Sequence, residues 1–133
     1  MSGASLTQPA LDAAILQAQL DGFEVVRADD TCLLLDIDTP EAMAQYQRVL
    51  PTVMERLGYE VERWASKSGN THIRINLHGA LPWATRYALQ AALGSDPIRE
   101  VLAVEQMMNG CDEAAMLFRP KATCSDATSS EPR

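Results

Sequence analysis

The feature that most constrains the fold is an ordered change of hydrophobic periodicity between residues 33 and 118. Apolar residues alternate with polar ones in some segments, as in strands, and recur at helical spacing in others. In chain order the segments are a strand at Leu33–Asp38, a helix from Thr39 to Gly58, strands at Tyr59–Trp64 and His72–Leu77, helices at Pro82–Leu93 and Pro97–Met108, and a strand at Ala114–Phe118. If the last two helices form one layer, the order is strand, helix, strand, strand, helix, strand.

This order is that of the split βαβ arrangement in ferredoxin-like and RNA-recognition-motif (RRM-like) folds. We therefore expect an α+β fold with a βαββαβ antiparallel sheet, helices on one face, and the first and third strands adjacent at its centre. A helix over Pro9–Asp21 and a strand over Phe23–Arg27 are expected to precede this unit. Polar turns predict two hairpins, one joining Phe23–Arg27 to Leu33–Asp38 and one joining Tyr59–Trp64 to His72–Leu77.

The length of 133 residues fits one domain of ordinary size. Apolar residues make up 47% of the chain and charged residues 22%, which is typical of a folded globular protein. The two ends are small and polar, and we expect residues 1–8 and 120–133 to be disordered. The predicted folded domain is therefore 9–119.

Several classes of protein are disfavoured by the absence of their sequence signals. The longest apolar runs have three or four residues, against about 20 for a membrane span, so no membrane association is expected. Residues 1–10 have no basic residue and no apolar stretch, which predicts no secretory signal. The scattered Cys32, Cys111 and Cys124 form no C-x-x-C pair, which argues against a disulfide framework or a zinc ribbon. We therefore expect a cytoplasmic protein.

The charge is unevenly divided along the chain. The net charge is −7, which ordinarily disfavours nucleic-acid binding, because phosphate contacts need Lys and Arg. Residues 1–62 hold 11 acids and 3 bases, a net −8, whereas residues 63–121 hold 7 bases and 5 acids, a net +2. The second half is therefore the better candidate for contacts with phosphate.

The two predicted central strands place polar side chains on a common face. Because side chains alternate along a strand, Leu33, Leu35 and Ile37 share one face, and we expect it to pack on the helices. The same holds for the aliphatic residues of His72–Leu77. The opposite, open face is then expected to carry Asp36, Asp38, His72, Arg74 and Asn76.

These residue types suit a metal and a phosphate. Two carboxylates about 6.5–7 Å apart along a strand can bind divalent cations, which neutralise triphosphate oxygens and activate an attacking oxygen. The glycine-containing loop before His72 offers backbone N–H groups, the hydroxyls of Ser66 and Ser68, and Lys67, which together suit a phosphate. A D-x-D at a strand end is also common as a solvated edge or turn cap, and His72 also fits a structural strand residue.

At these residues the chain resembles the archaeo-eukaryotic primase superfamily, the primase-polymerases with an RRM-like catalytic core, in a compact form like that of phages and plasmids. The resemblance covers Leu33 to Pro120. The family's first motif, a hydrophobic strand ending in D-x-D, is matched by Leu33–Asp38 (LLLDID). Its second, a Ser/Gly loop followed by a His that begins a strand, is matched by Ser66–Ile75 (SKSGNTHIRI).

The resemblance implies roles for these residues. Asp36 and Asp38 would bind catalytic Mg²⁺ or Mn²⁺, and the incoming triphosphate would be held by Ser66, Lys67, Ser68, His72 and Arg74. A third acid usually completes the metal site, and Asp96 in Leu93–Pro97 resembles the family's Gly-x-Asp motif. Asp96 is equally suited to be the N-cap of the next helix. The lesser alternatives for the third acid are Glu100, Asp112 and Glu113.

Three functions are compatible with these residues. The first is a primase-polymerase-like nucleotidyltransferase that uses two divalent metals to add nucleoside triphosphates to a 3′-hydroxyl of DNA in replication or repair. The chain has no zinc module, helicase domain or accessory template-binding domain, so its activity is expected to need other replication proteins.

The second function is that of a non-catalytic or partner-dependent RRM-like module that binds nucleotide or nucleic acid. Aromatic residues are only 5% of the chain, which disfavours RRM-type base stacking on the central strands. The third is a small structural or regulatory α+β domain.

Overall fold

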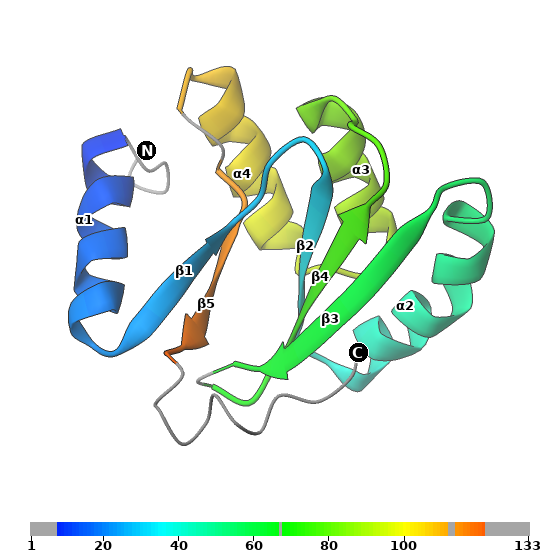
Figure 1. Cartoon of the computed structure of the whole chain (residues 1–133), viewed down its shortest axis with the longest axis horizontal. Helices are drawn as coiled ribbons and strands as arrows, with labels where there is room; N and C mark the ends of the chain where they lie inside the picture. Colours follow the sequence, from blue (N-terminus) through cyan, green and yellow to red (C-terminus); the bar gives the residue numbers. More distant parts are fainter. Residues whose placement is uncertain (1–7, 67, 112–113, 122–133) are drawn as a thin grey trace.

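The computed structural model describes residues 8–66, 68–111 and 114–121, and the fold of these residues is α+β. The predicted disordered ends lie outside the described residues except for Gln8, Pro120 and Lys121. The helices are α1 (Gln8–Leu20), α2 (Pro40–Val53), α3 (Trp83–Ala92) and α4 (Pro97–Met108), and the strands are β1 (Phe23–Arg27), β2 (Cys32–Ile37), β3 (Tyr59–Ala65), β4 (Thr71–Leu77) and β5 (Met116–Pro120) (Figure 1).

The strands form two antiparallel sheets. One has three strands in the order β2-β4-β3, and the other pairs β1 with β5. The predicted hairpin of β3 and β4 is confirmed, and so is the adjacency of β2 and β4. In this register Asp36 of β2 and Trp64 of β3 both lie opposite His72 of β4.

The predicted four-stranded ferredoxin-like sheet is not present, because the strand order differs. The final strand, β5, pairs with β1 and not with β2. The predicted hairpin of β1 and β2 is therefore wrong. Asp29 turns the chain between these strands by accepting hydrogen bonds from the backbone N–H and the hydroxyl of Thr31. The two strands then diverge, and an ion pair between Glu24 and Arg119 joins β1 to β5, with 2.6 Å between Glu24 Oε2 and Arg119 Nε.

The physical reason for this strand order lies at the edge of β2 that faces away from β4. Its hydrogen-bonding groups are used by the segment from α3 to α4. The backbone N–H groups of Leu34 and Asp36 donate to Gln90 Oε1 (2.9 Å) and Ser95 Oγ (3.0 Å). The guanidinium of Arg99 donates to the carbonyl oxygens of both Leu34 on β2 (3.3 Å) and Met116 on β5 (3.2 Å). Side chains thus satisfy this edge of β2 in the place of a fourth strand.

The predicted facing of the central strands is confirmed. The inward aliphatic residues of β2 and β4 are almost fully buried and pack with residues of α2 and with Leu89 and Leu93. A second cluster joins α4 and Tyr87 of α3 to both sheets through residues such as Val26, Leu34 and Leu117. In Figure 1, α1 lies beside β1, away from the other helices. Among the described residues, no helix combines the length and apolar character that crossing a membrane requires.

Candidate functional site

Asp36 and His72 form a pair at the junction of β2 and β4. They are cross-strand partners, and His72 Nε2 lies 3.5 Å from Asp36 Oδ1, an ion-pair contact that is longer than an ordinary hydrogen bond. Interaction with His72 lowers the pKa of Asp36 below its ordinary value, and the charge of Arg99 acts in the same direction, although burial opposes both. Asp36 is therefore an ionised carboxylate at neutral pH, held in a mostly buried position.

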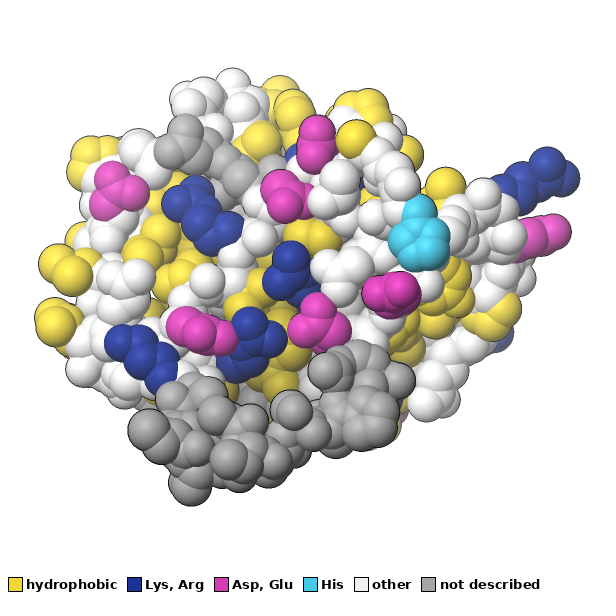
Figure 2. Space-filling model, in the orientation of Figure 1, with side chains coloured by type: hydrophobic (Ala, Val, Ile, Leu, Met, Phe, Trp, Pro, Cys, Tyr) yellow, Lys and Arg dark blue, Asp and Glu magenta, His cyan; other side chains and the backbone are white. Residues whose placement is uncertain are grey.

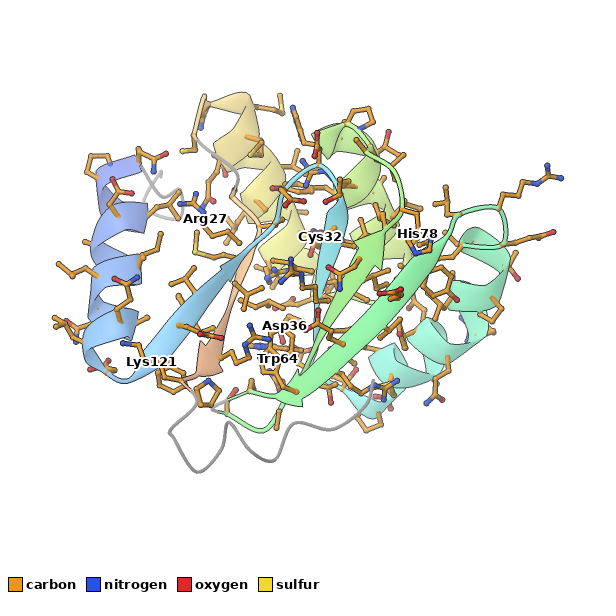
Figure 3. All side chains as sticks on the ribbon, in the orientation of Figure 1. Arg27, Cys32, Asp36, Trp64, His78 and Lys121 are labelled. Carbon is orange, nitrogen blue, oxygen red and sulfur yellow. The ribbon has the colours of Figure 1, made fainter. Side chains whose placement is uncertain are left out.

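The face of the β2-β4-β3 sheet that carries this pair was expected to be open, but part of it is covered. His72 is only 9% exposed, and the ring of Trp64 packs edge-on against it with the ring centroids 5.8 Å apart. The indole N–H of Trp64 donates to the carbonyl oxygen of Phe118 on β5, and the Arg119 guanidinium lies over the indole at 5.0 Å. In Figure 3, Trp64 and Asp36 lie close together near the ends of β3 and β2. Contacts between β5 and β3 thus cover part of this face.

A cavity of about 620 Å³ remains at the Asp36 end of this face, and we call it the main cavity. Its polar side consists of the Asp36–His72 pair and three residues of the loop between β3 and β4. Its other side consists of α1 and the two phenylalanines of the β1–β5 sheet. The lining residues are Ala14, Gln17, Ala18, Asp21, Phe23, Asp36, Ser66, Ser68, Asn70, His72 and Phe118.

The loop between β3 and β4 is a tight turn held by its own hydrogen bonds. The backbone N–H of Ser66 donates to the Asn70 carbonyl oxygen (2.7 Å), and that of Asn70 donates to Ser66 Oγ (2.9 Å). Gly69 has a φ of +93°, which favours glycine, and its N–H donates to the Ser66 carbonyl oxygen. These three backbone N–H groups are therefore engaged within the loop. The hydroxyls of Ser66 and Ser68, which lie 3.2 Å apart, and the Asn70 side chain are better placed to meet a ligand. Lys67 lies outside the described residues.

Asp38 lies apart from the main cavity. The strand was expected to reach Asp38, but β2 ends at Ile37 because the chain turns there into α2, whose N-cap is Thr39. Asp38 is exposed and lines a smaller cavity of about 270 Å³ together with Gly69, Asn70 and other residues. Of the two acids of the D-x-D motif, only Asp36 lines the main cavity.

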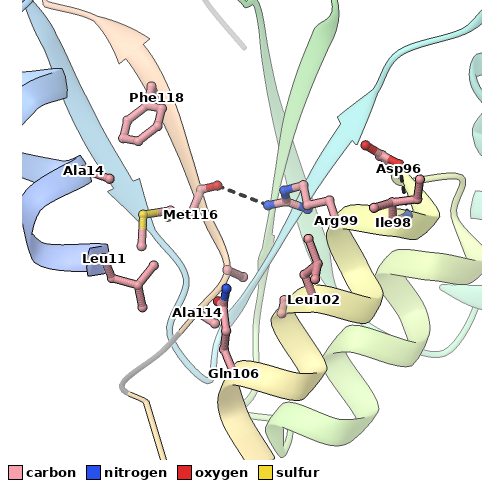
Figure 4. Close-up of a pocket in the computed structure, with 12 residues that line it drawn as sticks. Leu11, Ala14, Asp96, Ile98, Arg99, Leu102, Gln106, Ala114, Met116 and Phe118 are labelled. Atoms are coloured by element: carbon pink, nitrogen blue, oxygen red, sulfur yellow. Dashed lines mark hydrogen bonds between the residues drawn. The ribbon is translucent and has the colours of Figure 1, made fainter. Parts of the chain in front are cut away.

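Asp96 reaches Asp36 through the backbone and not through its carboxylate. Its N–H donates to the Asp36 carbonyl oxygen at 2.9 Å. Its side chain caps α4 by accepting from the backbone N–H of Ile98 at 3.1 Å (Figure 4). The Asp96 side chain lines a different cavity, of about 370 Å³, that also includes Arg99. The N-cap interpretation is therefore confirmed.

The remaining predicted residues serve other contacts. Arg74 is on the same face as His72 but does not line the main cavity. Hydrogen bonds from Thr31 lower the pKa of Asp29, and the charge of Arg74 acts in the same direction. Asn76 donates from its side chain to Glu62 on β3. Glu100 is 3% exposed and bonded to Gln90 and Arg99, and burial raises its pKa. Asp112 and Glu113 lie outside the described residues.

The acids nominated as metal ligands therefore lie in separate places. Within residues 8–66, 68–111 and 114–121, no group of three or more His, Cys, Asp or Glu side chains is arranged to hold a metal ion. Asp36 still fits a role as one ligand, because its carboxylate is ionised and lines the cavity next to the hydroxyl-bearing loop. Mg²⁺ is commonly bound by one or two carboxylates together with substrate phosphates, so a protein-only cage is not required.

Comparisons of the chain with protein-family models, curated proteins and solved structures gave no match.

Phe23, Phe118 and the α1 residues were not predicted as parts of the site. Phe23 and Phe118 look like ordinary strand residues in the sequence, and only the long-range pairing of β1 with β5 brings them together. Asn70 carried a local signal, since it follows the glycine of a predicted turn.

Proposed function

We propose that the main cavity binds a nucleoside triphosphate with a divalent cation, and that the chain is a primase-polymerase-like nucleotidyltransferase acting on DNA with other replication proteins. The observation that supports this best is that Asp36, His72 and the serines of the β3–β4 loop line one cavity of about 620 Å³. That volume lies within the usual range of about 300–1,000 Å³ for small-molecule sites.

Each polar residue has a role in the proposal. Asp36 holds Mg²⁺ or Mn²⁺ together with phosphate oxygens, and when bound the cation neutralises charge on the triphosphate. Ser66 and Ser68 donate hydroxyl hydrogen bonds to phosphate oxygens. His72 contacts the Asp36 carboxylate and favours its ionised form, since interaction with His72 is the largest contribution to its lowered pKa.

One feature of the fold supports the proposed relation to primase-polymerases. β2 and β4 are adjacent, as the first and third strands of the family's unit are, and they carry the two motifs at opposed positions. We propose that the β2-β4-β3 sheet corresponds to three of the four strands of that unit. The backbone N–H of Asp96 bonds to the carbonyl oxygen of Asp36, so the residue that resembles the third motif is next to the first motif, although its carboxylate caps α4.

The distribution of charge favours a short substrate held with the help of partners. Figure 2 shows Lys and Arg side chains interspersed with Asp and Glu side chains on the face it presents, so the basic side chains on this face do not gather into one patch. Tight binding to a long duplex requires many Lys and Arg contacts to phosphates. A nucleotide needs only a few, and the net charge of −7 therefore does not disfavour it.

The test is nucleotide binding and incorporation by the Asp36→Asn/Asp38→Asn double variant. We expect Mn²⁺-dependent binding of a fluorescent nucleoside triphosphate, measured by anisotropy, to be lost with an unchanged circular dichroism spectrum. Incorporation into a primed template should disappear as well. Glu55→Gln, which removes an exposed charge that does not line the main cavity, is the control and should bind as the unaltered protein does. Incorporation that survives in the double variant would refute the mechanism.

A second candidate is a nucleotide-binding module without catalysis. It is favoured by the absence of a three-ligand metal group among the described residues. Such a module would bind Mn²⁺ and the nucleotide but incorporate nothing on any primed template, with or without replication proteins. A purely structural domain would show no metal-dependent affinity for nucleotide.

A further inference from the structure

Both phenylalanines of the chain line the main cavity. The sequence contains two phenylalanines, Phe23 near its start and Phe118 near its end. Both are partly buried, and both border the cavity that also contains the Asp36–His72 pair. An aromatic surface thus forms part of a cavity whose other side carries the proposed phosphate ligands.

The register of β1 and β5 explains why the two rings are neighbours. Phe23 is opposite Pro120, and Val25 is opposite Phe118, so Phe23 and Phe118 lie on the same face of the two-stranded sheet at diagonal positions. Diagonal neighbours lie about 7–8 Å apart, which is within reach of aromatic side chains. The register therefore lets both rings contribute to one aromatic surface of the cavity.

Helix α1 borders the cavity on the same side as the two rings. It contributes Ala14 and Ala18, whose methyl groups are small, to the cavity. The polar residues on this side, Gln17 of α1 and Asp21 in the turn that follows it, bond to each other, with 3.1 Å between Gln17 Nε2 and Asp21 Oδ1. The α1 side of the cavity is therefore mainly apolar, and its polar pair is already engaged.

We propose that the aromatic surface of Phe23 and Phe118 stacks against the base of the nucleotide whose phosphates the proposed function places at Asp36 and the β3–β4 loop. This inference rests on that proposed function and adds the orientation of the substrate: base toward β1–β5, phosphates toward β2–β4. Stacking tolerates all bases because each has a π-face. We expect less than tenfold discrimination among the four bases, with purines bound more tightly because their rings are larger.

Comparison of ATP with inorganic tripolyphosphate, both with Mn²⁺, tests the inference. Titration calorimetry should show that the unaltered protein binds ATP about tenfold to a hundredfold more tightly than tripolyphosphate, the range expected for stacking of one base. Phe118→Leu keeps an apolar side chain but removes the ring, so it should reduce ATP affinity at least about fivefold and leave tripolyphosphate affinity unchanged. Phe118→Trp restores a ring and should retain ATP affinity.

The outcomes separate this inference from the function on which it rests. Equal affinities of the unaltered protein for ATP and tripolyphosphate, or an equal loss of both affinities in Phe118→Leu, would contradict stacking of the base on Phe23 and Phe118. Neither result would contradict the proposed phosphate site. Failure of the folded protein to bind either ligand would overturn the proposed function and this inference together. The indole N–H of Trp64 donates to the backbone oxygen of Phe118, so unchanged tryptophan fluorescence of Phe118→Leu verifies that this variant keeps the contact between β3 and β5. An unchanged circular dichroism spectrum verifies the fold of Phe118→Trp.

Discussion

The backbone N–H of Asp96 donates a hydrogen bond to the backbone carbonyl oxygen of Asp36, with 2.9 Å between nitrogen and oxygen. The side chain of the preceding residue, Ser95, accepts a hydrogen bond from the N–H of Asp36. The turn between α3 and α4 therefore pairs with β2 at the residue that lines the main cavity. A change in the position of this turn moves Asp36 directly.

The two roles considered for Asp96 can be separated by two substitutions. Asp96→Asn keeps an oxygen that can cap α4, so we expect unchanged stability and at most about a twofold change in Mn²⁺-dependent nucleotide affinity. Asp96→Ala loses the cap and should lower the free energy of unfolding by about 1 kcal/mol in urea titration. A loss of nucleotide affinity of tenfold or more in Asp96→Asn would instead make Asp96 a metal ligand.

Removal of the His72 imidazole should raise the pKa of Asp36. His72→Gln takes away the interaction that contributes most to the lowered value, and ¹³C NMR titration of the carboxyl group measures the change. Because the folded-state pKa of Asp36 lies below its unfolded value near 3.8, its ionisation stabilises the fold above that pH, and this stability is lost as the pH falls through the folded-state pKa. The variant should therefore unfold in acid at a higher pH.

His78→Gln provides the control for this titration. His78 is exposed, and the residue with which it forms an ion-pair contact is Glu60, 3.9 Å away. The Asp36 pKa should be the same in this variant as in the unaltered protein. A similar shift in both variants would contradict the assignment of the lowered pKa to His72.

Substitution of Arg99 should be strongly destabilising. Arg99→Met leaves the buried Glu100 carboxylate without its cation and two strand carbonyl oxygens without a donor, which costs on the order of 3–5 kcal/mol in unfolding free energy. Burial raises the pKa of Glu100 in the folded state. The contribution of Glu100 to the stability of the fold is therefore fully present below its unfolded-state pKa, near 4.5, and is lost as the pH rises through the folded-state pKa. The Arg99→Met defect should therefore be larger at pH 7 than at pH 4.

A second substitution checks that the cost arises from the buried charge. Glu100→Gln added to Arg99→Met removes the charge, so the double variant should recover part of the lost stability at pH 7 in urea titration. If the two losses simply add, the pair is not coupled and the explanation fails.

Gly94 should tolerate alanine less well than Gly22. Both have φ above +90°, which costs an alanine roughly 1–2 kcal/mol. At Gly94 the new Cβ would also lie 2.7 Å from the carbonyl oxygen of Ala42 on α2, whereas at Gly22 no atom lies within 4 Å. Gly94→Ala should therefore lose at least about 1 kcal/mol more than Gly22→Ala in urea titration. Equal losses would show that α2 moves aside freely.

The parts of the fold that depend on local pattern could be predicted from the sequence. The alternation in β2 and β4 is set by one buried face, so it identified both strands and placed Asp36 and His72 on a common face. The hairpin of β3 and β4 followed from a polar turn containing Gly69. Thr39–Pro40 was recognised as the start of a helix, and Thr39 caps α2 through the N–H of Ala42.

The parts that depend on distant partners could not be predicted. The pairing of β1 with β5 joins residues such as Glu24 and Arg119, and no local signal separates it from a hairpin of β1 with β2. The D-x-D spacing suggested that Asp36 and Asp38 share a strand face. The cap at Thr39 ends the strand between them and directs Asp38 elsewhere. The position of Phe118 in the site follows from the same long-range pairing.

The side chains along the outer edge of β2 also bear on self-association. An unpaired strand edge is a template on which strands of other chains can add, leading to aggregation. Here Gln90 and Arg99 occupy backbone groups of a strand whose residues are almost all buried. In a four-stranded sheet a whole strand would cover this edge of β2, and only a large rearrangement could remove it. In this protein the protection of the edge depends on single side chains. The side chains that bond to Leu34, two residues before Asp36, therefore also protect this strand edge against the addition of a strand from another copy of the chain.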